Sequence, residues 1–315
     1  MDSGQTRGLI FDIQGHSIHD GPGGRTLVLL SGCALRCAWC SNPEGQLLLR
    51  RLMFKARLCK NCPFRCVGAC PKSAARRPEH NGLPVTFDRR RCDSCDTMDC
   101  VKVCYRQALQ PSGKWYTVDE LMHVFDRDRF YWGPHGGISL GGGEPLLQQD
   151  FVLNLLERCQ DAYITVCLET SAYVPHEVLE AAVPYVQWLF IDIKHMDSAR
   201  HAAGTGVTNE LILDNIRWLK SSAWPGRVVI RMPVIAGFND TVENAEATAQ
   251  FMKQTGLNEM NLLPFHRLGA SKYEQLGICY NYAEQATMSP ESLEPLTAVY
   301  RGKGIRCYLG ADTPF

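Results

Sequence analysis

The sequence predicts an α/β fold, a partial barrel of six β/α units that a cysteine-rich insert interrupts near its start. From Gly136 onward, short apolar runs alternate with amphipathic segments of helical period, which is typical of a parallel sheet covered by helices. Over residues 52–111 the alternation stops, and cysteine, proline and basic residues indicate a module held together by metal rather than by an apolar core. We therefore expect the barrel to begin in 1–51, the insert to occupy 52–111 and the remaining barrel to follow in 112–315.

The predicted strands are short apolar runs, and the predicted helices repeat apolar residues every three or four positions. Six units suit a partial barrel rather than a closed one of eight, and in such barrels reactive groups gather at the C-terminal ends of the strands. We expect strands at Thr26–Leu30, Gly137–Leu140, Tyr163–Leu168, Trp188–Ile193, Arg227–Val234 and Met260–Leu263. Helices are expected at Asp150–Gln160, Pro175–Ala182, Asn209–Lys220, Val242–Thr255 and Pro290–Arg301.

The composition of the chain limits the classes of protein to which it can belong. Lys+Arg and Asp+Glu balance at 33 each, so no excess charge points to nucleic acid as a partner. Residues 1–8 have neither a basic start nor an apolar run, and no segment approaches the ~20 apolar residues of a membrane span. We expect a cytoplasmic protein without a membrane partner. Eleven of the 15 cysteines fall in three groups between residues 33 and 104, which favours metal or cluster ligands over disulfides.

The first cysteine group follows the strand predicted at Thr26–Leu30. Cys33, Cys37 and Cys40 have the spacing Cys-x3-Cys-x2-Cys, with Trp39 before the last cysteine. Three thiolates in this spacing are suited to a four-iron cluster, which needs four ligands, so one iron is left open. The alternatives are a zinc loop or buried cysteines, but zinc sites usually combine two Cys-x2-Cys-type pairs or include histidines.

The other two cysteine groups lie in the insert and resemble the bacterial ferredoxin run Cys-x2-Cys-x2-Cys-x3-Cys-Pro. In that run the fourth cysteine binds the other cluster, so the resemblance implies two exchanged quartets. The gap between the second and third cysteines is one residue longer in the first group and two longer in the second, and Tyr105 replaces the second proline. Two all-cysteine zinc sites are the alternative. The two exchanged quartets that the ferredoxin resemblance implies are Cys59, Cys62 and Cys66 with Cys104, and Cys92, Cys95 and Cys100 with Cys70.

Three polar motifs follow predicted barrel strands. The segment 141–145 reads Gly-Gly-Gly-Glu-Pro, and its glycines allow a backbone to approach a ligand closely, although a glycine triplet also occurs in plain loops. The segment 169–171, Glu-Thr-Ser, contains hydroxyl groups that could instead cap a helix. In the segment 192–194, Asp-Ile-Lys, the lysine could pair with a carboxylate and the aspartate could hold a cation or a hydroxyl, whereas an isolated pair of this kind is usually solvated.

Two later positions complete the candidate pocket. Arg231 lies within a predicted apolar strand, where an unpaired charge would be costly. His266 follows the strand predicted at Met260–Leu263. A single histidine is usually structural, but its place after a barrel strand favours contact with a cofactor.

Together these motifs resemble those of radical S-adenosylmethionine (SAM) enzymes. Segments 19–26 and 41–44, on either side of the first cysteine group, are similar to those of glycyl radical enzyme activating enzymes, and the resemblance runs through nearly the whole chain. It implies that SAM binds the open iron through its amino and carboxylate groups. It also implies that reductive cleavage gives a 5′-deoxyadenosyl radical, which abstracts hydrogen from a glycine of a partner enzyme.

The resemblance further implies the cofactors and the residues that hold them. The cofactors are SAM and three 4Fe–4S clusters, one with an open iron held by Cys33, Cys37 and Cys40 and two in the insert. Gly142 and Gly143, with the acid at Glu144, would meet the methionine amino group. Further SAM contacts are expected from Trp39, Glu169, Thr170, Ser171, Asp192, Ile193, Lys194, Arg231 and His266.

Within the family, the insert and segments 190–197, 237–240 and 263–269 are most similar to activating enzymes of decarboxylases of arylacetates such as 4-hydroxyphenylacetate. The resemblance implies such a decarboxylase as partner and a flavodoxin- or ferredoxin-type electron donor. Tyr273 departs from the pattern, since tryptophan is also common there. The alternatives are an activase of a diol dehydratase or alkylsuccinate synthase, a radical SAM enzyme acting on a small molecule or peptide, or a non-catalytic electron-transfer protein.

Overall fold

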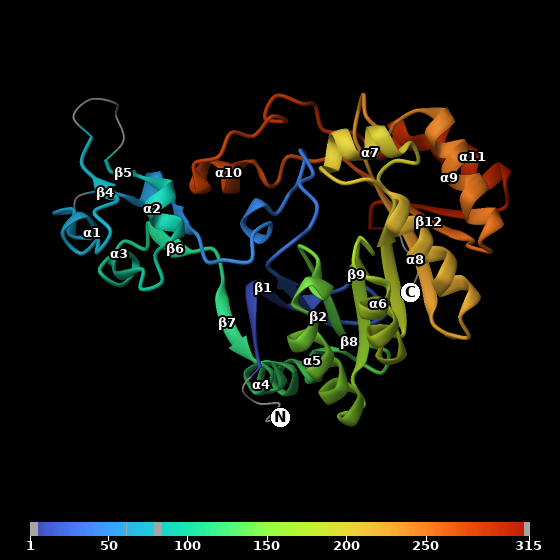
Figure 1. The fold of residues 1–315 in the computed structure, drawn as a ribbon, viewed down its shortest axis with the longest axis horizontal. Coiled ribbons are helices and arrows are strands. Elements are labelled where there is room, and N and C mark those ends of the chain that lie inside the picture. The colour runs from blue at the N-terminus through green and yellow to red at the C-terminus, as the bar shows by residue number, and fades with distance from the viewer. Residues whose placement is uncertain (1–5, 61, 79–83, 312–315) are drawn as a thin grey trace.

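The computed structural model describes residues 6–60, 62–78 and 84–311, and a nine-stranded sheet forms its centre (Figure 1). The strand order is β13-β12-β11-β10-β9-β8-β2-β1-β7. The strands from β13 to β2 are mutually parallel, whereas β1 (Arg7–Ser17) pairs antiparallel with β2 and with β7 (Lys114–Thr117). The α/β class and its parallel-rich sheet are therefore confirmed. The parallel strands are β2 (Arg25–Leu30), β8 (Gly137–Gly142), β9 (Thr165–Thr170), β10 (Trp188–Asp192), β11 (Arg227–Val234), β12 (Glu259–Pro264) and β13 (Arg306–Leu309).

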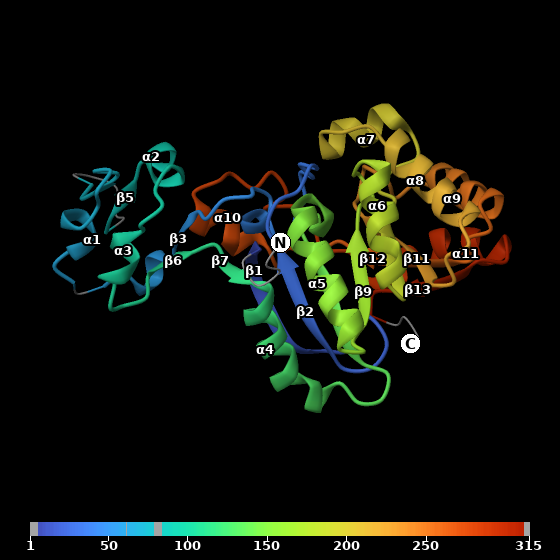
Figure 2. The same ribbon diagram turned by 60° about the horizontal axis from the view of Figure 1, so that its bottom comes forward.

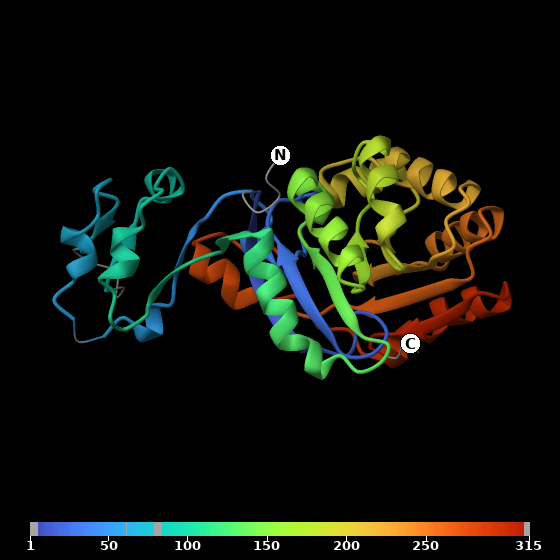
Figure 3. The ribbon, with the colours of Figure 1, turned by 90° about the horizontal axis from the view of Figure 1, so that it is seen from below.

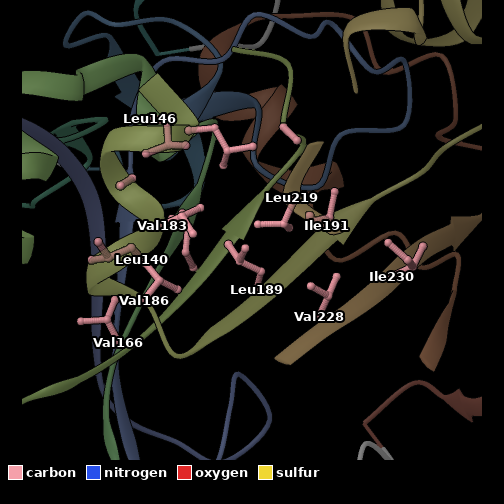
Figure 4. Packing of buried hydrophobic residues seen from close by; sticks show 14 of the residues in the cluster. Leu140, Leu146, Val166, Val183, Val186, Leu189, Ile191, Leu219, Val228 and Ile230 are labelled. Carbon is pink, nitrogen blue, oxygen red and sulfur yellow. The ribbon is translucent and has the colours of Figure 1, made fainter. Parts of the chain in front are cut away.

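The sheet separates an apolar core from a polar inner face. Alternate residues of a strand point to opposite faces, and Val166, Leu189 and Ile230 lie in the main hydrophobic core (Figure 4). Cys167 and Phe190, one position along, belong to a separate small cluster on the other face. That inner face also carries the charged side chains described below.

Helices connect the strands and cover the apolar face (Figures 2 and 3). All five predicted helices are confirmed, the last with its first residues in a 3₁₀ turn at Pro290–Leu293. Outside the insert, three of the described α-helices were not predicted, although Thr117 and Glu120 form a capping box that marks the start of one of them. The predicted helices are α5 (Gln149–Asp161), α6 (His176–Ala182), α8 (Glu210–Ser221), α9 (Val242–Gln254) and α11 (Glu294–Gly302), and the missed ones are α4 (Val118–Asp128), α7 (Ser198–Thr205) and α10 (Ala270–Leu276).

In the part of the chain that the structure describes, every helix is too short or too polar to cross a membrane. The cytoplasmic location stays a prediction.

The predicted strand boundaries differ from the observed ones at β9. Tyr163 was expected to begin this strand, but its backbone has φ 54° and its side chain is 97% exposed. A left-handed backbone cannot continue an extended strand, so β9 begins at Thr165 and continues through Glu169 to Thr170. The four-residue strand β13 and the edge strands β1 and β7 were not predicted.

The insert projects from one side of the sheet in all three overall views (Figures 1, 2 and 3). It has its own small hydrophobic cluster, which includes several of the cysteines. The strands β3 and β6 pair with each other where the chain enters and leaves the insert. Its elements are β3 (Leu52–Phe54), α1 (Arg65–Gly68), β4 (Ala75–Arg76), β5 (Thr86–Phe87), α2 (Arg89–Asp93), α3 (Asp99–Lys102) and β6 (Leu109–Pro111).

Candidate active site

A cavity of about 280 Å³ lies where the loops at the C-terminal ends of the parallel strands meet. It brings together residues that are more than 200 positions apart in the sequence. Of the twelve predicted SAM contacts, only Glu144 and Ile193 do not line it. The predicted residues in its lining are Cys33, Cys37, Cys40, Trp39, Gly142, Gly143, Glu169, Thr170, Ser171, Asp192, Lys194, Arg231 and His266.

The loop that carries the three cysteines is held by α7. The backbone N–H of Arg36 donates to the carbonyl of Thr205 at 2.6 Å, and that of Ala38 donates to Gly204 at 3.1 Å. The side chain of Trp39 is buried beside this junction, and its ring contacts another aromatic ring. Contacts with the protein therefore shape this loop independently of any metal that the cysteines bind.

Burial raises the pKa of all three thiols. The pKa of Cys33 rises to about 11 and that of Cys37 to about 12, while the ammonium group of Lys194 opposes the rise at each. The pKa of Cys40 is also raised, chiefly by burial. Without metal the thiols are protonated at neutral pH, so iron must displace protons to obtain thiolate ligands.

The glycine loop after β8 packs directly against the cysteine loop. Gly142 has φ 115°, and a Cβ atom there would lie 2.6 Å from the backbone of Leu30. A Cβ atom on Gly143 would lie 2.2 Å from the carbonyl oxygen of Gly32. Any larger residue at these two positions would clash with backbone atoms, so only glycine allows the two loops to pack this closely. The glycines also leave backbone groups exposed to the cavity.

Glu144 supports the cavity from behind. It was expected to contact the ligand, but it is fully buried and does not line the cavity. Its carboxylate accepts hydrogen bonds from the hydroxyls of Thr170 and Ser171 at 2.7–2.8 Å, and from the backbone N–H of Ser171 at 2.8 Å. Neither hydroxyl caps a helix, because α6 begins only at His176. Glu144 thus ties the glycine loop to the end of β9.

Lys194 is nearly buried and pairs with Asp192 at the end of β10. The Nζ–Oδ2 distance is 2.6 Å, and the lysine side chain is 8% exposed against 33% for the aspartate. Burial works against the charge of Lys194, but the carboxylate of Asp192 raises its pKa. The lysine therefore stays charged beside the three cysteines.

Arg231 is not an unpaired charge. Its Nη1 atom lies 2.6 Å from a carboxylate oxygen of Glu169, and its guanidinium carbon lies 3.8 Å from the ring centroid of Phe190. Burial raises the pKa of Glu169 to about 7, and Arg231 opposes that rise. All three side chains come from neighbouring strands and share the inner face of the sheet.

The last two predicted contacts lie at opposite extremes of exposure. His266 is exposed at the edge of the cavity, and its Nδ1 accepts a 3.4 Å hydrogen bond from the backbone of Leu268. Ile193 has a side chain that is 1% exposed and packs in the main core. Its side chain therefore does not face the cavity, and a contact between Ile193 and SAM stays a prediction.

The contacts between α10 and the cysteine loop were not predicted from the sequence. The hydroxyl of Tyr273 donates to the carbonyl of Cys40 at 2.8 Å. Lys272 donates to Asn42 at 2.8 Å and pairs with Glu44 at 2.5 Å. These contacts join segments about 230 residues apart, so no local pattern could identify them.

The insert brings its eight cysteines together in two small cavities. Cys59, Cys62, Cys66 and Cys104 line one, and Cys70, Cys92, Cys95 and Cys100 line the other. Phe64 donates its backbone N–H to the sulfur of Cys62 at 3.3 Å, and Ala74 does so to Cys70 at 3.2 Å. Within residues 6–60, 62–78 and 84–311, no three His, Cys, Asp or Glu side chains converge closely enough to hold a single metal ion.

Comparison with known proteins identifies the family. Residues 89–252 match the radical SAM superfamily. The chain is 44% identical over 311 residues to the 4-hydroxyphenylacetate decarboxylase activating enzyme of Clostridium scatologenes, covering 98% of this chain and 99% of that protein. This chain belongs to the radical SAM activating enzymes of glycyl radical enzymes. The indoleacetate decarboxylase activating enzyme of Tractidigestivibacter scatoligenes is 38% identical over 313 residues, covering 98% and 99% of the two chains.

A radical SAM methyltransferase from Sphaerobacter thermophilus has a similar fold, with a TM-score of 0.52 at 15% identity over 91% of this chain and 68% of that one. Membership of the radical SAM family implies SAM and a 4Fe–4S cluster, and the cavity of this activating enzyme fits both. Three thiols share it with a glycine backbone and a buried lysine. Its volume approaches the lower end of the roughly 300–1,000 Å³ range of ligand pockets.

We expect Lys194→Met to weaken SAM binding by roughly ten- to a hundredfold. Methionine keeps most of the apolar stem but removes the cation that would meet the cofactor carboxylate, and a hydrogen bond to a charged group contributes about 1.5–3 kcal/mol. The measurement is equilibrium binding of SAM to the anaerobically reconstituted protein. Thermal stability should stay near wild type, because Asp192 is partly exposed and can be solvated.

The matched control is Lys220→Met, an exposed lysine on α8. It should change neither binding nor stability. A large loss of stability in Lys194→Met with unchanged affinity would show that the lysine serves folding instead.

Proposed function

We propose that this radical SAM activase generates the glycyl radical of an arylacetate decarboxylase of the 4-hydroxyphenylacetate type. The observation that carries the proposal is the single cavity that joins the cysteine triad, the glycine loop and the Asp192–Lys194 pair. The similarity to activating enzymes of two arylacetate decarboxylases favours this partner over a diol dehydratase or alkylsuccinate synthase.

In this proposal the residues that line the cavity hold the cluster or bind SAM. Cys33, Cys37 and Cys40 hold the cluster, and the backbone of Gly142 and Gly143 meets the methionine amino group. Lys194 binds the carboxylate, while Glu169 accepts from the ribose hydroxyls. When bound, the cluster and SAM together supply a 5′-deoxyadenosyl radical, which takes one hydrogen atom from the partner glycine.

The shape of the sheet supports access by a partner loop. β13 and β7 stand at the two ends of the strand order, and no pairing joins them among the described residues. We infer that the sheet forms a partial barrel of the radical SAM type rather than a closed one. A gap between its edges would admit a peptide loop to the cavity.

We further infer that residues 52–111 form a ferredoxin-like module with two 4Fe–4S clusters, set between barrel segments 1–51 and 112–315. The two cavities support this, because each holds the cysteines of one exchanged quartet. A zinc ion needs four sulfurs about 2.3 Å from one point, and the cysteines do not converge in that way. A flavodoxin- or ferredoxin-type donor in the cytoplasm would supply the electrons.

The test is activation of a purified decarboxylase. Anaerobically reconstituted, reduced protein with SAM should produce a glycine-centred doublet in the electron paramagnetic resonance spectrum of 4-hydroxyphenylacetate decarboxylase. 5′-Deoxyadenosine should accumulate, and decarboxylation should begin only after the doublet appears. Indoleacetate decarboxylase and a diol dehydratase are tested in parallel. Activation of the diol dehydratase alone would overturn the proposed partner, and an absence of 5′-deoxyadenosine would overturn the enzyme assignment.

A further inference from the structure

The charge of this neutral protein is divided unevenly. Residues 52–111 contain 12 lysines and arginines against 5 aspartates and glutamates, whereas the rest of the chain contains 21 and 28. A local excess of this size produces a positive potential that acts beyond contact distance. The insert is therefore a basic module attached to an acidic body.

The net positive charge is concentrated at one of the two cysteine quartets, because the described acidic residues lie near the other. Arg57, Lys60, Arg65 and Arg106 are all exposed and lie beside Cys59, Cys62, Cys66 or Cys104 in sequence, and we call these four side chains the basic rim. Arg65 and Arg106 also line the cavity of that quartet. The acidic residues that the structure describes in the insert all lie at 88–99, beside the other quartet.

The basic rim has no acidic partner among the residues that the structure describes. None of its four side chains forms an ion pair with another described residue, whereas Arg91 and Lys102 near the second quartet pair with Asp88 and Asp99. The sulfurs of Cys62 and Cys70 accept from backbone N–H groups rather than from basic side chains. The charges of the rim are therefore available to a molecule in solution.

One part of the rim, Arg65 on α1, lies at the far end of the insert. Figures 1 and 2 show α1, which carries Arg65, on the side remote from the sheet. The second quartet lies nearer the body of the protein, since Arg89 of α2 donates to the carbonyl of Gln275 in α10 at 3.0 Å. The same helix α10 holds the loop of Cys40 through Tyr273. The order of elements thus runs from the rim through the two quartets toward the cavity.

We propose that the basic rim is the docking surface for a small acidic one-electron carrier protein, so that electrons enter the activase at the quartet completed by Cys104. This inference rests on the proposed function of the insert as a two-cluster module. In the step, the reduced carrier loses one electron and the cluster at this quartet gains it, with no transfer of atoms. Opposite charges on rim and carrier would speed encounter and orient the two proteins.

The experiment follows reduction of the reconstituted holoenzyme by stopped flow, with an acidic plant-type ferredoxin as the donor. Its potential, about −400 mV, is suited to low-potential clusters. Arg65→Glu/Arg106→Glu should lower the second-order rate constant at low salt by roughly tenfold or more, and salt should slow the wild type toward the variant. Reduction of the same variant by photoreduced deazaflavin, a small donor, should keep the wild-type rate.

The matched control, Lys220→Glu/Lys253→Glu, makes the same change of charge on exposed lysines of α8 and α9. It should be reduced by the ferredoxin at nearly the wild-type rate. Equal slowing of both double variants would overturn the proposal, because net charge and not the rim would then set the rate. A rim variant reduced at the wild-type rate would overturn it directly.

Two further measurements distinguish weaker docking of the carrier from loss of a cluster and from binding of the decarboxylase at the rim. If Arg65→Glu/Arg106→Glu loses iron, the neutral variant Arg65→Gln/Arg106→Gln replaces it, and a wild-type rate in that variant at full iron content would count against the proposal. Glycyl radical formation driven by deazaflavin tests the activase function independently of the rim. If ferredoxin reduction is normal in the rim variant but deazaflavin-driven radical formation falls, the rim binds the decarboxylase and the carrier assignment is wrong.

Discussion

Replacement of Cys37 by alanine should abolish SAM cleavage in the reduced, reconstituted protein, and the same is expected for Cys33 and Cys40. A cluster with an open iron needs three thiolates, and two cannot hold it in the cavity. The measurement is 5′-deoxyadenosine released under reducing conditions, together with total iron. Iron should fall from roughly twelve atoms to roughly eight, because the two insert clusters remain.

Cys279→Ala is the matched control, since Cys279 is an exposed free cysteine outside all three groups. It should retain full iron and full cleavage. Iron near four atoms in the wild type, with zinc bound in addition, would contradict the assignment of the insert. SAM cleavage in Cys37→Ala at a substantial fraction of the wild-type rate would contradict the role of the triad.

The cavity was largely predictable because its chemistry is carried by short motifs at the ends of strands. The Cys33, Cys37 and Cys40 spacing is local, and so is the Asp192–Lys194 pair at the end of β10. A parallel sheet brings the C-terminal ends of its strands to one edge. Predicted strands with approximately correct ends therefore sufficed to gather most of the predicted cofactor contacts in one cavity.

Other features could not be predicted from the sequence, because they depend on partners that are distant in sequence. Glu144 turns away from the cavity because Thr170 and Ser171 supply its hydrogen-bond donors from the next strand. Arg231 could be placed in a strand, but only the structure shows that Glu169 neutralises it. A buried charge requires a partner, yet its sequence does not say which residue provides it.

The position of helix α10 also depends on contacts with residues that are distant in sequence. Its seven residues contact the cysteine loop through Lys272 and Tyr273. At its other end, Arg89 of the insert donates to Gln275. One short helix thus connects the insert to the loop of the first cluster. A helix of this length has little intrinsic stability, so tertiary contacts determine where it forms.

The exchange of cysteines between the two quartets should appear as a characteristic pattern of iron loss. Cys70→Ala/Cys92→Ala removes two members of one structural quartet, so only one cluster should be lost and roughly eight iron atoms should remain. Cys59→Ala/Cys70→Ala removes one member of each quartet and leaves three thiolates at both, as at the open-iron site, so roughly twelve iron atoms should remain. The sets follow the two cavities, in which Cys70 lies with Cys92, Cys95 and Cys100 although it is closer in sequence to Cys59.

Iron analysis of the two double variants decides between exchanged and sequential quartets. If each group of four consecutive cysteines held its own cluster, the results would be reversed: Cys59→Ala/Cys70→Ala would keep eight iron atoms and Cys70→Ala/Cys92→Ala twelve, to within about one atom. Both variants change two cysteines and share Cys70→Ala, so a general loss of stability would lower iron in both. Only the pairing of cysteines across the insert gives opposite outcomes, because Cys104 must reach back to Cys59, Cys62 and Cys66 to complete their quartet.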